Sequence, residues 1–386
     1  MTRNIVIIGS GVAGLASAIF LRRLGHSITL YERQAKLSEL GAGIVCWPNA
    51  CFVLEQLGLL SVIKKSGGAL RAMSRFNLQG QSLGSIDVEL INRAMSGYPS
   101  YSILRKDLMR ILEAEAIRVG ATIRYGCKVQ TITDVDTERA TVLVNGEMIS
   151  ADLIIGADGR MNSIARQYVL GNNQPVFQQV VNWIGIANFA DAHFTELSVF
   201  DFWGVGQRFG VVPVSATTAY WAAAEYLVAD EEEVSQAVPT DKFADWPELV
   251  QQVLTHAESS SVRRIAIYDH NPADIWQKKN VLMLGDAAHA ALPTSGQGAC
   301  QALEDSWHLF EIMKQDPSMD DVGKRLLNVR KAKTDNILYA GRQLSDSLFK
   351  ADQAQSILRN QRSIETDYEQ VAQGMAAFWR QGLPMD

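Results

Sequence analysis

The chain has 386 residues, of which 47% are hydrophobic and 20% are charged; these values are ordinary for a globular protein of two or three domains and exclude disordered, collagen-like and coiled-coil chains. The formal net charge of −6 at pH 7 gives no global basic field, so no nucleic-acid partner is expected. The cysteines Cys46, Cys51, Cys127 and Cys300 form no CxxC pair, which argues against disulfides or a metal site and predicts a reducing, cytoplasmic location.

The first predicted elements are a strand, a glycine-rich turn and a helix. Residues 4–21 carry no charge and resemble a membrane span, but three glycines at fixed spacing and the Arg22-Arg23 pair favour a soluble segment, so no transmembrane segment is expected. Asn4–Ile8 is an apolar run typical of a buried parallel strand. The next six residues, Gly9-Ser10-Gly11-Val12-Ala13-Gly14, match GxGxxG, and a helical pattern follows them. This order is typical of a dinucleotide-binding unit.

A second apolar strand, Ser27–Tyr31, is followed directly by Glu32. In such a unit, Gly9 permits the tight turn, Gly11 lets the backbone approach a pyrophosphate, and Gly14 lets the helix pack closely on the strand. The helix N-terminus offers free N–H groups to the phosphates. The Glu32 carboxylate can accept hydrogen bonds from a ribose hydroxyl pair, and it would repel the 2′-phosphate of NADP. The fingerprint alone does not choose between FAD and NAD.

Helices and strands alternate from residue 36 to residue 155. The predicted helices are a stretch that ends at Leu60 and an amphipathic segment over 102–120, whose apolar residues recur with helical spacing. Strands are predicted within 71–90, 121–133, 140–144 and 153–155, with Asn145-Gly146 as a hairpin turn.

The sequence pattern changes over residues 176–226, where apolar and aromatic residues alternate with polar ones and turns recur near 204–206 and 215–218. This pattern predicts an antiparallel sheet. Farther along the chain, the acidic stretch 228–260 is expected to be helical, 281–284 to be a buried strand, and 298–315 and 321–380 to be helices over the core.

Residues 282–305 contain another strand, loop and helix N-terminus. Asp286 stands at the end of the strand and can bind ribityl hydroxyls, and Gly296-Gln297-Gly298 opens the helix. The amides of Gly298 and Ala299 can face the N1–C2=O edge of a flavin. That edge becomes negative on reduction, so the helix dipole would stabilise the reduced state by up to roughly 2 kcal/mol. We interpret His289, beside this motif, as a hydrogen-bonded structural residue.

Three motifs follow one another along the sequence: the Gly9–Gly14 turn, GADGRMNSIAR at 156–166, and GDAAHAALPTSGQG at 285–298. With them the chain resembles the single-component, FAD-dependent aromatic hydroxylases of the para-hydroxybenzoate hydroxylase type. The resemblance implies an α/β fold, in which a Rossmann-like FAD-binding domain with a parallel sheet is joined by an inserted, mainly antiparallel β-sheet substrate domain and C-terminal helices. The expected boundaries are 1–72, 99–173 and 276–345 for the FAD-binding domain, 73–98 and 174–275 for the substrate domain, and 346–386 for the C-terminal helical segment.

The resemblance also implies roles for single residues. Glu32 would bind the adenosine ribose, and Arg105 the FAD phosphate or ribityl region. Two structural alternatives stay open: Arg105 can be a solvated charge on its helix, and Asp158 can cap the helix that follows it. The full set of residues expected at the FAD is Gly9, Gly11, Ala13, Gly14, Glu32, Arg33, Ala42, Gly43, Arg105, Val129, Asp158, Asp286, Gly296, Gln297, Gly298 and Ala299.

The family chemistry needs no second GxGxxG, because NADH or NADPH acts only as a transient reductant. The resemblance implies that NAD(P)H reduces FAD and that O₂ then forms a C4a-hydroperoxide, which transfers oxygen to an aromatic substrate. The WxWxIP motif of flavin halogenases does not fit, since residues 183–186 read WIGI. An FAD-dependent reductase of the same fold and a non-catalytic flavoprotein remain alternatives. The choices between NADH and NADPH, and between monomer and homodimer, stay open.

In the expected substrate domain, Asn182, Arg208 and Tyr220 are the candidate substrate-binding residues, and Arg208 and Tyr220 are also the candidate catalytic residues. A buried arginine needs an anionic partner, which a substrate carboxylate or enolate can supply. The three residues match the spacing in flavin-dependent urate hydroxylases, the nearest branch, which also share Trp47-Pro48-Asn49. Quinolone hydroxylases have a similar arginine and tyrosine, so urate, salicylate-like, hydroxynicotinate-like and quinolone substrates all stay open.

Overall fold

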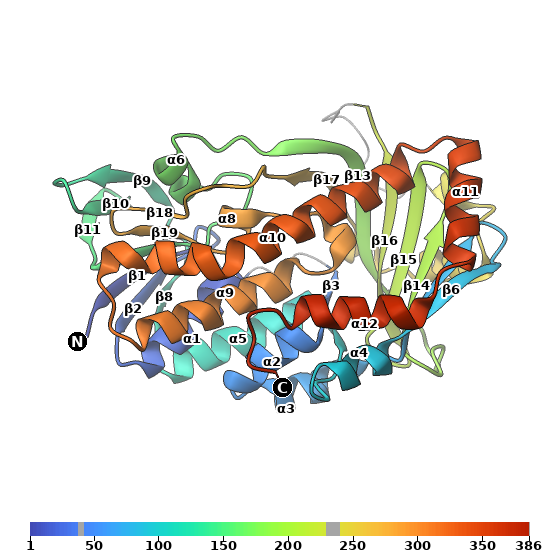
Figure 1. Cartoon of the computed structure of the whole chain (residues 1–386), viewed down its shortest axis with the longest axis horizontal. Helices are drawn as coiled ribbons and strands as arrows, with labels where there is room; N and C mark the ends of the chain where they lie inside the picture. Colours follow the sequence, from blue (N-terminus) through green and yellow to red (C-terminus); the bar gives the residue numbers. More distant parts are fainter. Residues whose placement is uncertain (38–41, 229–239, 386) are drawn as a thin grey trace.

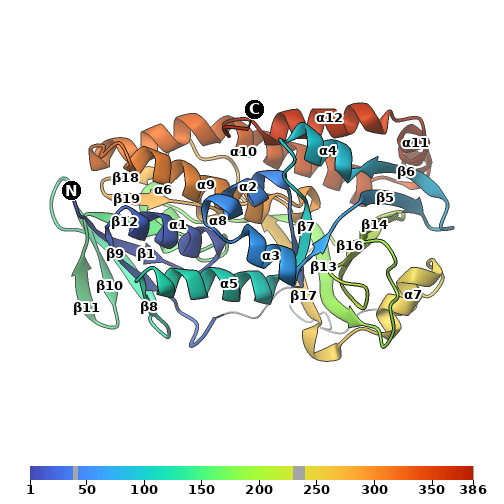
Figure 2. The same cartoon turned by 90° about the horizontal axis from the view of Figure 1, so that it is seen from below.

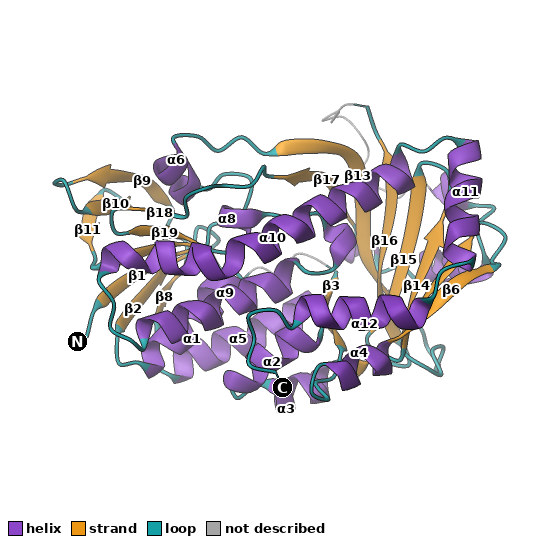
Figure 3. Ribbon diagram, in the orientation of Figure 1, coloured by secondary structure: helices purple, strands orange, loops and turns teal. Residues whose placement is uncertain are grey.

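The structure is a computed structural model that describes residues 1–37, 42–228 and 240–385. Two large β-sheets lie toward opposite ends of an elongated molecule, and long helices run beside them (Figures 1 and 3). One sheet is parallel apart from an edge pair, and the other is mainly antiparallel. The predicted α/β fold, with a second sheet and C-terminal helices, is therefore confirmed.

The six-stranded sheet has the order β18-β19-β12-β1-β2-β8. Helix α1 (Val12–Arg23) is buried over its first ten residues and contacts both α5 (Arg105–Arg118) and α9 (Gly298–Met313). Because helices cover this sheet, its central strands β1, β12 and β19 are nearly continuous apolar runs. The carboxyl ends of the parallel strands meet at one edge, where ligands bind in such sheets. The strands are β1 (Asn4–Ile8), β2 (Ser27–Tyr31), β8 (Thr122–Arg124), β12 (Leu153–Gly156), β18 (Gln277–Lys278) and β19 (Val281–Met283).

The segment predicted as one helix over 102–120 begins differently. Tyr101–Leu104 is strand β7, which is buried and pairs with β3 (Gly43–Cys46) and β4 (Gly68–Ala69), and α5 starts only at Arg105. A run of four buried residues has no periodicity of its own, so the helical spacing that follows concealed the strand.

The hairpin predicted at Asn145-Gly146 is confirmed, because the two residues have φ values of 50° and 85°, as a tight hairpin turn requires. It joins β10 (Ala140–Val144) to β11 (Glu147–Ser150), and β9 (Val129–Asp134) completes this small sheet. Further helices are α2 (Pro48–Gln56), α3 (Leu60–Ser66), α4 (Val88–Ala94), α6 (Ile164–Leu170) and α8 (Asp286–His289).

The seven-stranded sheet has the order β17-β13-β16-β15-β14-β5-β6, and only β14 and β5 pair in parallel. One face packs large aromatic side chains, including Trp183, Phe209 and Trp221, against α7 (Glu248–Thr255). The opposite face carries polar side chains such as Asn182 and Arg208, with small residues such as Ala222 and Ala224 between them. The strands are β5 (Ala72–Asn77), β6 (Ser82–Asp87), β13 (Val176–Asn188), β14 (Ser198–Trp203), β15 (Gln207–Pro213), β16 (Thr218–Tyr226) and β17 (Arg263–Asp269).

The acidic stretch 228–260, predicted to be helical, is helical only in part. Residues 229–239 lie outside the described residues. The rest contains α7 and two short 3₁₀ helices, Thr240–Phe243 and Ser259–Ser261, because turns and loops separate its apolar residues into short groups.

Three helices follow α9, namely α10 (Met319–Phe349), α11 (Gln353–Ile364) and α12 (Tyr368–Trp379). Helix α10 extends from the six-stranded sheet to the seven-stranded sheet, and α12 lies beside α4 (Figure 2). The expected boundary at 345/346 falls inside α10, and the domain division stays a proposal. In the part of the chain that is described, no helix combines the length and the apolar character needed to cross a membrane.

Candidate active site

The carboxyl edge of the six-stranded sheet carries the Gly9–Gly14 turn at the start of α1. Gly9 has a φ of 99°, and a Cβ there would lie 2.4 Å from the carbonyl oxygen of Ala157, so only glycine fits. A Cβ on Gly14 would lie 2.1 Å from the Gly9 oxygen. At Gly11, a Cβ would meet none of the described atoms within 4 Å. The turn therefore borders open space, which fits a pyrophosphate held against the backbone.

Glu32 lies beside this turn at the end of β2. Its carboxylate accepts hydrogen bonds from the Ser10 amide (2.9 Å), the Ser10 hydroxyl (3.0 Å) and the Gln34 amide (2.9 Å). Arg33 is exposed next to it. Residues 126 and 127 donate to the carbonyls of Gln34 and Glu32, which brings the start of β9, with the buried Val129, to the same strand end. These positions suit an adenosine group.

Arg105, the first residue of α5, is half-buried. Among the described residues, no acceptor forms a hydrogen bond or ion pair with its guanidinium group. Burial lowers the pKa of Arg105, although the charge of Asp286 counteracts this effect. A cation that is removed from water without a bonded partner favours a nearby anion, so this side chain fits a phosphate ligand better than the alternative of a solvated charge.

Asp286 and Asp158 already have partners within the protein. Asp286 forms an ion pair with Arg160 at 2.9 Å; burial alone would raise its pKa, but Arg160 brings the pKa below its ordinary value. Asp158 accepts hydrogen bonds from the Ser163 hydroxyl (2.7 Å) and the Ala165 amide (3.2 Å), and burial raises its pKa. Asp158 therefore stabilises the N-terminus of α6, which is the structural alternative that the sequence left open.

The second glycine motif forms the N-terminus of α9, which packs against α1. Gly296 has a φ of 61°, and a Cβ there would lie 3.2 Å from Nε1 of Trp47. At Gly298, a Cβ would meet none of the described atoms within 4 Å. Within the described ranges, Trp47 Nε1 and Gln297 Nε2 are buried without a hydrogen-bond partner. Unpaired donors at a helix N-terminus, which continues with Ala299, fit the electron-rich edge of a flavin.

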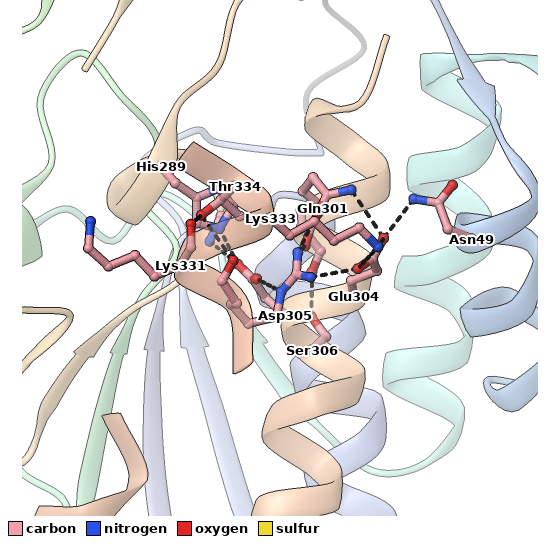
Figure 4. A network of polar contacts seen from close by, with 12 residues as sticks. Asn49, His289, Gln301, Glu304, Asp305, Ser306, Lys331, Lys333 and Thr334 are labelled. Carbon is pink, nitrogen blue, oxygen red and sulfur yellow. Dashed lines mark hydrogen bonds and ion pairs between the residues drawn. The ribbon is translucent and has the colours of Figure 1, made fainter. Parts of the chain in front are cut away.

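Behind this helix N-terminus lies a network of buried charges (Figure 4). Glu304 and Asp305 of α9 face Arg330 of α10, and the side chains of all three are fully buried. Arg330 Nη1 lies 2.6 Å from Glu304 Oε2, and Arg330 Nε lies 2.9 Å from Asp305 Oδ1. Lys333 Nζ lies 2.9 Å and 2.8 Å from the two Glu304 oxygens. Two cations and two carboxylates thus compensate one another away from water.

The network connects α9 to two other parts of the chain. Asn49 of α2 donates to Glu304 Oε1 (2.6 Å) and to Gln297 Oε1 (2.9 Å). Lys333 also donates to the carbonyl oxygen of Trp379 (2.5 Å), near the C-terminus. Gln301 of α9 also donates to Gln297 Oε1 at 2.9 Å, so the side chain of Gln297 is positioned by contacts from α2 and α9.

Asp305 also binds the histidine of the third motif. His289 Nε2 lies 2.6 Å from Asp305 Oδ2, which accepts a further hydrogen bond from the Gly285 amide at 2.9 Å. Burial alone would raise the pKa of Asp305, but His289 and Arg330 hold it well below its usual range. The structural interpretation of His289 is confirmed. His308 lies on α9, as Asp305 does, and its buried Nε2 has no hydrogen-bond partner among the described residues. Burial lowers the pKa of His308 to about 4.

The three candidate substrate residues share one face of the seven-stranded sheet. Asn182 of β13 pairs with Ala224 of β16, which in turn pairs with Arg208 of β15. Tyr220 lies four residues before Ala224 on β16, so its side chain points to the same face. The prediction that Arg208 and Tyr220 occupy adjacent strands is confirmed.

This face and the loop before α9 enclose a cavity of about 190 Å³. Asn182, Arg208 and Tyr220 all line it, and small residues leave the space between them open. Ligand sites for drug-sized molecules measure roughly 300–1,000 Å³, so this cavity fits a compact ring compound. The small residues are Gly210, Ala222 and Ala224, and the other lining residues include Val45, Trp47, Asp201, Leu292, Pro293, Thr294, Ser295 and Gly296.

Tyr220 also contacts the first residue of β3. A Cβ on Gly43 would lie 1.9 Å from Cδ1 of Tyr220, so only glycine lets the backbone pass the ring. Ala42, the preceding residue, accepts a hydrogen bond from the Arg105 amide at 3.3 Å. Burial raises the pKa of Tyr220 well above its ordinary value, so the hydroxyl stays protonated and can donate a hydrogen bond.

Arg208 has an anionic partner within the protein, so a substrate anion is not needed to balance its charge. Asp201 of β14 accepts hydrogen bonds from Arg208 Nε (2.6 Å) and Nη2 (3.0 Å), and from Trp203 Nε1 (2.8 Å). The sequence analysis did not identify this partner, because Asp201 lies on the neighbouring strand β14. A carboxylate inside the apolar strand SVFDFW is the signal that would have indicated this pair.

Sequence reasoning also missed the cations of the buried network. Arg330 and Lys333 stand three residues apart on α10, a spacing that puts both on one helix face. Their partner Glu304 lies on another helix, so only the three-dimensional structure brings the charges together.

Comparison with known proteins decides the family. The FAD binding domain family matches residues 2–316. The chain belongs to this family. It is 32% identical over 347 residues to an FAD-dependent urate hydroxylase of Mycolicibacterium vanbaalenii, with 86% of this chain and 84% of that protein covered. It is 30% identical over 307 residues to an aurachin C monooxygenase/isomerase of Stigmatella aurantiaca, with 78% of each covered.

A solved structure of Klebsiella pneumoniae HpxO, in complex with FAD and uric acid, has a TM-score of 0.89 to this chain. The two are 26% identical, with 98% of this chain and 97% of that chain covered. The chain is therefore an FAD-dependent monooxygenase of the aromatic hydroxylase class, with NAD(P)H as the reductant typical of the family. The resemblance that the three motifs implied is confirmed at this level.

Proposed function

We propose that the enzyme hydroxylates a small aromatic or heteroaromatic compound in the cavity beside the loop before α9, with urate as the first candidate. NADH or NADPH is the transient reductant, and O₂ is the co-substrate. One observation carries the proposal: Asn182, Arg208 and Tyr220, from three different strands, line the same cavity as Gly296 of the flavin motif. The urate hydroxylase relative, and the HpxO structure that contains uric acid, support urate.

The residues proposed to hold FAD follow the two glycine motifs. The Gly9–Gly14 turn with Ala13 would bind the pyrophosphate, Glu32 the adenosine ribose, and Arg105 a phosphate. When bound, the flavin supplies the oxygen-activating redox chemistry. The other proposed contacts are Arg33, Ala42, Gly43, Val129, Asp158 and Asp286 along the cofactor, and Gly296, Gln297, Gly298 and Ala299 at the isoalloxazine ring.

The protein's own residues bind and orient the substrate ring. Arg208 donates hydrogen bonds to an oxygen or nitrogen of the ring and stabilises negative charge that develops there. Tyr220 donates from a hydroxyl that stays protonated, and the amide of Asn182 can both donate and accept. The apolar walls exclude water from the reacting ring.

The test mixes FAD-loaded enzyme, NADH or NADPH, and air with each of four substrates: urate, salicylate, a hydroxynicotinate and a 4-quinolone. NAD(P)H loss, peroxide and product mass are followed. We expect one compound to accelerate NAD(P)H oxidation and to gain one oxygen atom from O₂. Anaerobic turnover with an alkene acceptor would identify a reductase, and absence of any turnover would identify a non-catalytic flavoprotein; either result contradicts the proposal.

A cytoplasmic location and a monomeric or homodimeric state are further parts of the proposal. All four cysteines are free, and three of them are buried, which suits a reducing compartment. Sedimentation analysis of the purified enzyme would distinguish the monomer from the homodimer.

A further inference from the structure

The Asp201–Arg208 pair determines which chemical groups can be recognised in the cavity. Asp201 occupies Nε and Nη2 of Arg208, at 2.6 Å and 3.0 Å, and two adjacent N–H groups of this kind are what fit a carboxylate. No acceptor in the described part of the chain bonds Nη1 of Arg208. Both residues line the cavity, so a ligand meets free N–H groups of a guanidinium whose charge is already balanced.

Other side chains fix the position of Asp201. Trp203 Nε1 donates to Asp201 at 2.8 Å, and the guanidinium carbons of Arg75 and Arg359 each lie 5.2 Å from the centroid of the Trp203 ring. Neither of these two arginines is among the residues that line the cavity. Arg359 donates instead to the carbonyl oxygen of Gly204 at 3.1 Å. Among the described residues that line the cavity, the one arginine is therefore Arg208, which is paired with Asp201.

We propose, building on the function proposed above, that Asp201 excludes aromatic carboxylates and selects rings recognised through a ring carbonyl or a ring nitrogen. A substrate carboxylate would find the paired N–H groups of Arg208 occupied and would lie near a second carboxylate, which repels it. A ring oxygen or nitrogen needs only the remaining N–H groups of Arg208, and Asn182 and Tyr220 add further hydrogen bonds. Asp201 thus favours urate-like and quinolone-like rings over salicylate-like and hydroxynicotinate-like acids.

A matched pair of ligands tests this specificity by calorimetric titration of the FAD-loaded enzyme. 4-Hydroxybenzoate and 4-hydroxybenzamide have the same ring and nearly the same shape, but only the first carries a carboxylate. We expect the unaltered enzyme to bind the amide at least tenfold more tightly than the acid. Asp201→Ala vacates the paired N–H groups, so the acid should bind at least tenfold more tightly than to the unaltered enzyme. Asp201→Asn keeps the side-chain size without the charge and should give a smaller gain.

Glu225→Gln is the matched control, because Glu225 is also an ion-paired carboxylate of this sheet, with Lys242 Nζ at 2.8 Å, and does not line the cavity. It should leave the ligand preference unchanged. If Asp201→Ala fails to fold, Asp201→Asn decides. The inference is overturned if the unaltered enzyme binds the acid as tightly as the amide, or if the variant tested gains no affinity for the acid.

The titration also separates this inference from the proposed function. If the ligand preference shifts as expected but no compound of the panel is hydroxylated, the proposed function fails and the specificity stands. If a compound is hydroxylated but the preference does not respond to Asp201, the specificity fails and the function stands.

Discussion

The ion network behind α9 and the polar wall of the cavity both set an arginine against a carboxylate, but they differ in what remains unbonded. In the network, the Nε, Nη1 and Nη2 groups of Arg330 all have side-chain acceptors. In the cavity, Arg208 bonds Asp201 through Nε and Nη2, and Nη1 has no acceptor in the described ranges. A saturated network fixes the positions of the elements that it joins, whereas unbonded donors facing a cavity are available to a ligand.

The same contrast is found among the residues proposed to contact FAD or to border it. Asp286 and Asp158 have protein partners, while Arg105, Trp47 Nε1 and Gln297 Nε2 have none among the described residues. We therefore expect substitutions of the paired carboxylates to change stability as well as binding, and substitutions of the unpaired donors to change mainly binding.

The largest effect is expected from Glu304→Ala, which leaves Arg330 and Lys333 buried without their shared carboxylate. The free energy of unfolding should fall by about 3–5 kcal/mol, measured by denaturant titration. Glu311→Ala is the control on the same helix, since Glu311 forms a partly exposed pair with Lys314 at 3.0 Å and should cost less than about 1 kcal/mol. Equal losses for the two variants would contradict a structural role of the network.

Replacing Glu32 with Ala should weaken binding of FAD, because the carboxylate assigned to the adenosine ribose is lost. A hydrogen bond to a charged group contributes about 1.5–3 kcal/mol, so the dissociation constant should rise by roughly 10- to 100-fold, as measured by flavin fluorescence during titration of the apoprotein. The Glu311→Ala control should bind FAD normally. An unchanged affinity in Glu32→Ala would refute the ribose assignment.

Arg208→Met should spare FAD binding and raise the KM for the aromatic substrate about tenfold, or convert NAD(P)H consumption into peroxide release. The physical reason is that the ring loses its charged hydrogen-bond donor. Because this change leaves Asp201 without its partner, the double variant Arg208→Met with Asp201→Asn serves as a control for the unpaired carboxylate. Steady-state kinetics with peroxide detection would show Arg208 to be structural if KM and coupling both stay normal.

Stability should fall as the pH is lowered from about 6.5 to 4 because of His308. In the folded state its pKa is lowered from 6.5 to about 4, so in this window the unfolded state binds more protons and stability rises with pH by up to about 1.4 kcal/mol per pH unit. His308→Gln should flatten this slope, measured by denaturant unfolding at several pH values. The exposed His256→Gln is the control, and an unchanged slope in His308→Gln would contradict the assignment.

The parts of the site that could be predicted from the sequence are those carried by local motifs. The pattern of one short βαβ segment predicts the roles of Gly9, Gly14 and Glu32. The placement of Arg208 and Tyr220 on adjacent strands is predicted by strand alternation and by the length of the turn between them. The motif at Gly296 follows from the same logic of strand, loop and helix N-terminus.

What the local motifs did not indicate depends on partners that lie on different elements. Asp201 meets Arg208 only because β14 and β15 are neighbours, and Glu304 meets Lys333 only because α9 packs on α10. Strand β7 was missed because four buried residues have no periodicity that distinguishes a strand from the start of a helix.

The central claim is that two distant glycine motifs hold one FAD beside the cavity lined by Arg208, and a crystal structure of the FAD-loaded enzyme with uric acid tests it most directly. We predict one FAD that extends from the Gly9–Gly14 turn to the N-terminus of α9. The purine should lie in the cavity within hydrogen-bond distance of Nη1 of Arg208. A flavin that contacts only one of the two motifs, or a purine bound outside this cavity, would contradict the account.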